Sequence, residues 1–137
     1  MLRIRAMVES DFEAVTRLWK ASEGLGLCGP RQAFDRFLKR NEGMSPVAVH
    51  DGEVVGAVHC GDDGYRGYLY HLAVDQRFQG QGIGRALIDW CLDRLAARGL
   101  TRCSIFVYRE NSEGEKFWRG IGWRERIDLN VFAKDLQ

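Results

Sequence analysis

The stretch from Gln79 to Arg85 has the residue types of a phosphate-binding turn. Glycines occur in it at alternate positions, Gly80, Gly82 and Gly84, and glycine lets the backbone adopt positive φ angles and come close to a ligand. An amphipathic helix follows directly. The first turn of a helix has N–H groups without an intrahelical acceptor and carries a partial positive charge. We therefore predict that these backbone amides bind a phosphate or pyrophosphate group.

Two common phosphate-binding motifs differ from this turn. A Walker A motif requires Gly-Lys followed by Ser or Thr, and residues 72–85 contain no lysine. The dinucleotide motif G-x-G-x-x-G has a different spacing from Gly80-x-Gly82-x-Gly84, and the strand that precedes this turn comes late in the chain. An ordinary glycine-rich turn between a strand and a helix remains as the alternative without a ligand.

Hydrophobic periodicity predicts the elements that position this turn. Strands are predicted at Leu2–Ala6, Pro46–His50, Val54–Cys60, Tyr68–Val74 and Cys103–Tyr108, with a last strand or strands within Trp123–Ala133. Helices are predicted at about Asp11–Ala21, from about Pro30, from Ile83 to Gly99, and at about Ser112–Arg119. The element order is therefore β-α-α-β-β-β-α-β-α-β.

This order predicts an α/β fold with one mixed sheet. A helix connects Tyr68–Val74 to Cys103–Tyr108, which makes these two strands a parallel pair. The earlier strands are joined by short turns such as Asp51-Gly52 and are antiparallel. We expect a single domain over residues 1–137, with about six or seven strands and helices on both faces of the sheet.

Length and charge restrict the classes of function. The chain has 137 residues, with 20 Lys and Arg against 19 Asp and Glu, so its formal net charge is +1. This near balance argues against a dedicated nucleic-acid or membrane-surface binder, which usually has a basic excess. No apolar run reaches the roughly 18 residues of a membrane span. The N-terminal residues do not form the apolar core of a signal peptide, so we expect a cytoplasmic protein.

The cysteines and histidines do not have the spacing of a metal site. The cysteines, Cys28, Cys60, Cys91 and Cys103, are widely spaced and predict reduced thiols. Three of them lie in apolar segments and are expected to pack in the core. Cys28 lies in the glycine-rich stretch Gly24–Gly29, where a catalytic thiol is the alternative interpretation. We therefore predict no bound metal.

The pattern Gln79-x-x-Gly82-x-Gly84 resembles the Q/R-x-x-G-x-G/A pyrophosphate signature of the GNAT acetyltransferase superfamily. Leu72-Ala73-Val74 precedes it at the spacing which that superfamily uses, and the resemblance covers nearly the whole chain. Asn111 and Phe117–Trp123 match its second signature, N-x-x-A-x-x-F-Y-x-x-x-G-F, imperfectly. The segment 63–67 followed by Tyr70 is also similar to a group of small bacterial members described as YpeA-like.

The resemblance implies a site for acetyl-CoA between two splayed parallel strands. Backbone groups of Leu72 and Val74 would bind the pantetheine arm, and the amides of residues 79–85 would bind the pyrophosphate. The Asn111 side chain would reach a pantetheine amide, although a helix N-cap is the simpler role for this residue. The cofactor-binding residues predicted in this way are Leu72, Ala73, Val74, Gln79, Gly80, Gln81, Gly82, Ile83, Gly84, Arg85, Asn111 and Trp118.

The sequence departs from the superfamily pattern at Trp118, where the family commonly has a tyrosine that protonates the departing thiolate. An indole N–H is a donor without useful acidity, so Trp118 cannot take over that role, and Tyr108 is the candidate substitute. Tyr70 and Tyr68 stand at the positions where related enzymes often hold a Glu or His base. A tyrosine with a pKa near 10 is a poor base, but it can order a water molecule.

Strand alternation bears on which other group could act as the base. It predicts two faces, with Tyr68, Tyr70, Leu72 and Val74 on one and Leu69, His71 and Ala73 on the other. By this argument the side chain of His71, whose pKa suits a general base better than that of tyrosine, faces away from Tyr68 and Tyr70. Asp62, Asp63 and Glu110 could act through water, or they are solvated turn residues.

These observations predict an acetyl-CoA-dependent N-acetyltransferase. It would transfer the acetyl group to a primary amine of a small molecule or peptide by direct attack in a ternary complex. The acceptor pocket would be formed by the first two helices, their connecting loop and the turn at Gly61–Gly67. A catalytically silent module that binds or senses acyl-CoA, and a nucleotide- or phosphate-binding domain of another kind, are the alternatives. A homodimer stays open.

Overall fold

Five strands form one mixed sheet in the computed structural model, which describes residues 1–26 and 29–137. In their order across the sheet they are β1 (Leu2–Ala6), β2 (Pro46–His50), β3 (Glu53–Asp62), β4 (Gly67–Val74) and β5 (Cys103–Ile105). The pairs from β1 to β4 are antiparallel, and β4 and β5 are parallel. The predicted α/β class with a mixed sheet is confirmed.

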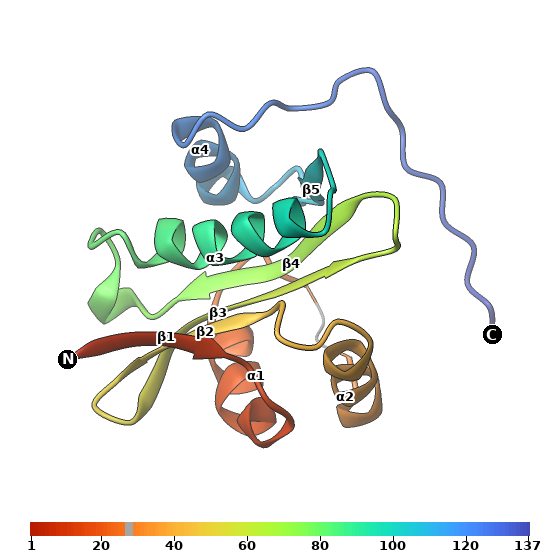
Figure 1. The fold of residues 1–137 in the computed structure, drawn as a ribbon. Helices are drawn as coiled ribbons and strands as arrows, with labels where there is room; N and C mark the ends of the chain where they lie inside the picture. The colour runs from red at the N-terminus through yellow and green to blue at the C-terminus, as the bar shows by residue number, and fades with distance from the viewer. Residues whose placement is uncertain (27–28) are drawn as a thin grey trace.

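Helices cover both faces of this sheet (Figure 1). On one face lie α1 (Phe12–Ala21) and α2 (Arg31–Arg40), and on the other lie α3 (Ile83–Ala97) and α4 (Ser112–Gly120). Each helix presents its apolar side to the sheet, because only burial of that side offsets the entropy lost on ordering the chain. The result is a three-layer arrangement in which the sheet separates two apolar cores.

The two cores differ in composition. Below α3 the core is largely aliphatic, and its fully buried members include Val55, Val58, Leu69 and Leu87. Two thiols, Cys60 and Cys91, are also buried there, and the Cys60 side chain, with burial, raises the pKa of the Cys91 thiol. Burial also raises the pKa of Cys103, to about 12. These cysteines pack as predicted, and Cys28 lies outside the described residues.

The sheet has fewer strands than the sequence indicates. The segment 123–133 forms no strand, and its apolar side chains are exposed, with Ile127 at 88% and Phe132 at 92%. Figure 1 shows this C-terminal segment running from α4 past the sheet without joining it. Apolar alternation therefore predicted a strand that pairs with no other strand in this structure. In addition, β5 ends at Ile105 instead of Tyr108.

Candidate active site

An irregularity in the pairing of β3 with β4 shapes the candidate site. Ala57 pairs with Ala73 and His59 pairs with Tyr70, so two steps along β3 correspond to three along β4. The extra residue makes a β-bulge in β4. At this point His71 has a φ angle of 60°, a left-handed conformation that is uncommon for residues other than glycine. Such strained positions recur at functional sites, because the surrounding structure must hold them.

The bulge turns two consecutive side chains to the same face of the sheet. Tyr70 lies against Phe37 of α2 with ring centroids 5.9 Å apart, and His71 lies against Trp19 of α1 at 5.1 Å. Leu72 then packs with the core on the α3 side. The simple alternation that set His71 apart from Tyr70 is therefore wrong from this residue onward, because the bulge inserts one residue into the repeat of two.

The two parallel strands separate just before the bulge. The ladder between β4 and β5 consists of the pairs Gly67–Cys103, Tyr68–Ser104 and Leu69–Ile105, and it ends there. From residue 70 to residue 74, the edge of β4 that faces β5 therefore has no strand partner among the described residues. Backbone groups on such an edge can bind an extended ligand in the way they would bind another strand. This is the splay that the family resemblance implies.

The turn before α3 has the geometry of an anion site. Gly80 and Gly82 have φ angles of 80° and 84°, and a Cβ atom at either position would meet no heavy atom within 4 Å. Among the described residues, none accepts a hydrogen bond from the amide N–H groups of residues 80–85. These donors lie at the start of α3, where the helix dipole favours negative charge. The turn thus fits the phosphates of a CoA molecule.

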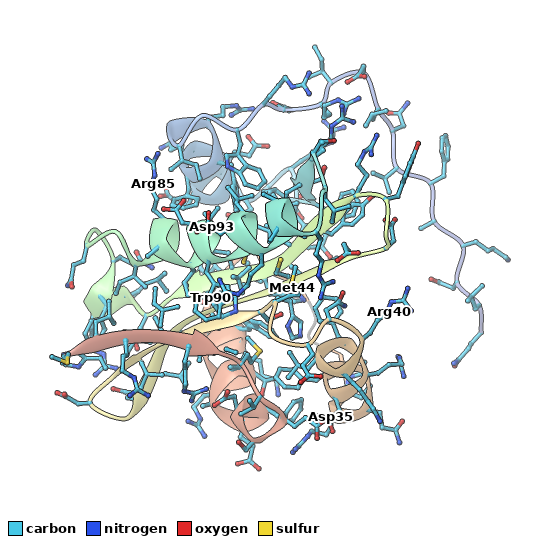
Figure 2. The ribbon with its side chains drawn as sticks, in the orientation of Figure 1. Asp35, Arg40, Met44, Arg85, Trp90 and Asp93 are labelled. Carbon is cyan, nitrogen blue, oxygen red and sulfur yellow. The ribbon has the colours of Figure 1, made fainter. Side chains whose placement is uncertain are left out.

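Three side chains beside this turn have different roles. Gln79 donates through Nε2 to the Val74 carbonyl oxygen at 2.9 Å and so ties the turn to the end of β4. Arg77 is bound to the carboxylates of Asp75 and Glu53 at 2.9 and 3.0 Å, which neutralise its charge. Arg85 is exposed, and its side chain extends outward from the first turn of α3 (Figure 2). It is therefore the cation placed to reach an anionic ligand.

Asn111 caps the helix that follows the splay. Its Oδ1 accepts a hydrogen bond from the Gly114 N–H at 3.0 Å, and its Nδ2 donates to the Gly24 carbonyl at 3.4 Å. The N-cap interpretation is confirmed, and a contact with pantetheine stays a prediction. Gly24 has a φ angle of 81°, and a Cβ there would lie 2.6 Å from Asn111 Cγ. Only glycine fits this contact.

The loop between α1 and α2 reaches the same region. A Cβ at Gly26 would lie 2.8 Å from the ring of Tyr108. The neighbouring Leu25 forms a backbone hydrogen bond with the His71 side chain. One short loop therefore contacts both the residue of the β4 bulge and the tyrosine predicted to protonate the leaving thiolate. Tyr68, the third predicted catalytic tyrosine, instead stacks on Phe106 with ring centroids 6.0 Å apart.

A cavity of about 260 Å³ lies between these helices and the sheet. The described residues that line it are Thr16, Trp19, Gly29, Ala33, Phe34, Phe37, His59, Tyr70 and His71. It is thus open to the two side chains that the bulge turns to this face. The prediction that the first two helices and their loop form an acceptor pocket agrees with this position. The turn at Gly61–Gly67 does not contribute to the lining.

The titratable groups of the cavity are held in their neutral forms. Burial, together with the nearby His71, lowers the pKa of His59 to about 3. Burial also lowers the pKa of His71, while its hydrogen bond with the Leu25 backbone acts in the opposite direction. Burial raises the pKa of Tyr70 above its usual 10. At neutral pH His59 is therefore uncharged, and the lowered pKa of His71 favours its neutral imidazole, which can accept a proton.

Trp118 lies in the core, next to the site. It is 8% exposed and packs on Phe117 and Trp123, with centroid distances of 5.2 and 4.5 Å. Phe117 in turn lies against Gly84, where a Cβ would be 3.4 Å from the Phe117 ring. The tryptophan that replaces the family's tyrosine thus supports the helix that carries Asn111, and a direct contact with the cofactor stays a prediction.

Sequence reasoning missed one residue of the site and misplaced another. His59 was not singled out, because a single histidine in a buried strand is indistinguishable from a packing residue until the aromatic cluster around it is known. Strand alternation placed His71 on the face opposite Tyr70, and no glycine or proline in this segment signals the bulge.

In the described part of the chain, no three His, Cys, Asp or Glu side chains are grouped to hold a metal ion. None of its helices is long and apolar enough to cross a membrane.

Comparison with known proteins agrees with this geometry. Residues 12–123 match the sequence model of the acetyltransferase (GNAT) family. The chain is also 37% identical over 136 residues to "Acetyltransferase ECA0875" of Pectobacterium atrosepticum, and the match covers 98% of this chain and 96% of that protein.

Solved structures of several acetyltransferases have the same fold. Ard1 from Thermoplasma volcanium superposes with a TM-score of 0.78 at 23% identity, over 88% of this chain and 81% of that one. The aminoglycoside acetyltransferase AAC(6')-Iy, bound to a bisubstrate analogue, gives 0.77 at 19% identity, over 98% and 99%. A ribosomal-protein-alanine N-acetyltransferase from Brucella melitensis gives 0.74 at 21% identity, over 97% and 99%. At these identities the likeness establishes the fold alone.

Proposed function

The chain belongs to the GNAT acetyltransferase family, and on this premise we propose that it transfers an acetyl group from acetyl-CoA to a primary amine. The acceptor would be a small molecule or a peptide, and the amine would attack directly in a ternary complex. The observation that carries this proposal is the β4 bulge. It turns His71 and Tyr70 toward the cavity and leaves the next residues, from Leu72 on, at the open edge beside β5.

The cofactor half of the site would use backbone groups. The amides of residues 80–85 and the exposed Arg85 would bind the pyrophosphate, and the free edge at Leu72 and Val74 would bind the pantetheine arm. Acetyl-CoA supplies an activated acyl group when bound. The Leu72 N–H would then donate to the thioester carbonyl oxygen, where negative charge develops during attack.

His71 would accept the proton of the incoming amine. An alkylamine is largely protonated at neutral pH and must lose this proton before it can attack. The neutral His71 imidazole lies at the cavity wall next to Leu72, and the Leu25 backbone beside it acts to raise its pKa against the effect of burial. Tyr70 would order the amine or a water molecule beside it, because its raised pKa keeps the hydroxyl protonated.

The departing thiolate would receive its proton from a tyrosine outside the core. Trp118 is buried and has no acidic proton, so the proposal keeps Tyr108 as the donor and Tyr68 as the alternative. Tyr108 is 56% exposed and lies against the loop at Gly26. Because a free thiol has a pKa of only about 8.5, water can also satisfy this step.

A single set of measurements tests the proposal. CoA should raise the melting temperature by mass action, whereas NAD should not. Acetylated product should appear by mass spectrometry, with intersecting initial-velocity lines for a ternary complex. Equal stabilisation by NAD and CoA would contradict the cofactor assignment, and tight CoA binding without turnover of any amine would favour a silent acyl-CoA-binding module.

The role of His71 can be tested separately. His71→Gln should lower kcat by about 10²- to 10⁴-fold, which is the usual contribution of a general base. The loss should be smaller at alkaline pH, where more of the amine is already deprotonated. His50→Gln is the matched control, since His50 lies at the end of β2 away from the cavity. A His71→Gln enzyme with unchanged kcat and pH profile would refute the role.

A further inference from the structure

The lining of the cavity restricts the acceptor more narrowly than the fold does. Among its described residues there is no Asp, Glu, Lys or Arg, and six of the nine carry rings, namely Trp19, Phe34, Phe37, His59, Tyr70 and His71. A pocket that selects an acceptor with several positive charges would need carboxylates, because desolvating an unpaired charge costs more than apolar contact returns.

The aromatic rings are arranged around a common space. His59 lies 4.9 Å from Trp19, 5.1 Å from Phe34 and 4.4 Å from Phe37, measured between ring centroids. Aromatic groups attract one another at centroid distances of about 4.5 to 7 Å in tilted or edge-on geometries. These rings pack against one another, and a further ring that entered the cavity would meet aromatic side chains of the same cluster. The wall therefore favours a flat or compact apolar group.

Two carboxylates lie at the end of strand β3 or just after it and already have partners. Asp63 is the carboxylate whose charge acts on Tyr70, and its oxygen accepts hydrogen bonds from the backbone N–H groups of Tyr65 and Arg66 at 2.7 and 2.8 Å. Asp62 is paired with Arg98 at 2.6 Å. Both carboxylates already have partners, and neither lines the cavity. The described lining therefore offers no charged partner for a second ammonium group.

The size of the cavity suits a small acceptor group. Its volume of about 260 Å³ is below the roughly 300–1,000 Å³ of pockets that bind drug-sized ligands. Resting on the proposed function, we infer that the acceptor is a primary amine carried by one apolar or aromatic group, with no second positive charge. This group occupies the cavity between α1, α2 and the sheet. It can belong to a free arylalkylamine or to the N-terminal residue of a peptide.

A panel of amines tests the inference and distinguishes its two sources. With acetyl-CoA saturating, 2-phenylethylamine and a tripeptide with N-terminal phenylalanine are compared with spermidine and kanamycin. We expect kcat/KM for at least one aromatic amine to exceed that for both polycations by about tenfold or more, which is the selectivity that an apolar pocket provides. The better of the two aromatic amines identifies the source.

Cavity variants link this selectivity to the lining. Ala33→Phe should fill the cavity from α2 and raise KM for the preferred aromatic amine about tenfold, with KM for acetyl-CoA unchanged. Ala96→Phe, on the exposed side of α3, is the matched control and should change neither value. Phe37→Glu is a second variant, which should move the preference toward spermidine by placing a carboxylate in the wall. An unaltered preference in folded forms of both cavity variants would overturn the inference.

Different results would contradict the inferred acceptor selectivity and the proposed acetyltransferase function. Acetylation of spermidine or kanamycin with a kcat/KM equal to or above that of the aromatic amines would overturn the inference and leave the function intact. Absence of CoA binding would overturn the function. If CoA binds and no amine is acetylated, calorimetric titration of the CoA-loaded protein decides. Binding of 2-phenylethylamine but not spermidine supports the inference, and any other order refutes it.

Discussion

The neutral histidine in the cavity wall predicts a specific loss of stability in acid. Burial holds the pKa of His59 at about 3 in the folded protein, against an ordinary value of 6.5. The unfolded chain therefore binds a proton more tightly than the folded one, and acid favours unfolding. This contribution to stability is complete above the unfolded pKa and is lost as the pH falls toward the folded one. The full difference corresponds to about 5 kcal/mol, of which about 2 kcal/mol is lost between pH 7 and pH 5.

The variant His59→Phe isolates this effect. Phenylalanine keeps an aromatic ring beside Trp19, Phe34 and Phe37, and it cannot be protonated. The Ser45 hydroxyl, 3.4 Å from His59 Nδ1, keeps its hydrogen bonds with the Cys60 backbone. Urea unfolding at a series of pH values should show the wild-type free energy of unfolding falling by about 2 kcal/mol more than that of the variant between pH 7 and pH 5. Because His71 titrates in both proteins, the difference between their two pH profiles measures the contribution of His59 protonation. Parallel profiles within about 0.5 kcal/mol would refute the reasoning.

Three glycine substitutions give further predictions. Gly82→Asp places a carboxylate in the anion site, and calorimetry should show loss of CoA binding while circular dichroism shows a retained fold; unchanged affinity would move the phosphate site elsewhere. Gly67→Ala puts a methyl group 2.6 Å from a buried leucine of α3, so urea unfolding should show a destabilisation of about 1–3 kcal/mol, and no change would mean that the leucine yields freely. Gly24→Ala forces a methyl group against Asn111 at a positive φ and should raise KM for acetyl-CoA several-fold in steady-state kinetics. Gly52→Ala has a similar φ in open space and is its control; equal KM values in the two variants would exclude Asn111 from the cofactor site.

The parts of the site that follow from local backbone requirements were predictable from the sequence. The turn at residues 79–82 and the start of α3 at Ile83 depend on glycines whose conformations few other residues adopt. Asn111 is likewise recognisable as a cap from its type and its place before a helix. In each case the residues that carry the information are next to one another in the chain.

The features that were not predicted depend on partners distant in sequence. The bulge at His71 is set by the pairing of β4 with β3, and nothing in Tyr70-His71-Leu72 alone marks it. Once β4 bends there, β5 loses its partner after Ile105, which explains why the strand is shorter than its apolar residues suggest. The segment 123–133 has a strand-like pattern but pairs with no strand of the sheet. An alternating pattern predicts which side chains of a strand would face the core. A strand also needs a neighbouring strand to pair with, and the pattern does not predict that partner.

The bulge also has a consequence for how variants of this enzyme can arise. Because it turns both Tyr70 and His71 toward the cavity while Leu72 packs toward α3, adjacent codons specify the wall of the cavity and the core under α3. Replacement of Tyr70 or His71 changes the side chains presented to the acceptor, whereas replacement of Leu72 or Val74 changes those packed toward α3. The backbone groups proposed to hold the acetyl donor are indifferent to side-chain identity. Substitutions in the cavity wall can thus change the acceptor specificity while binding of the acetyl donor is retained.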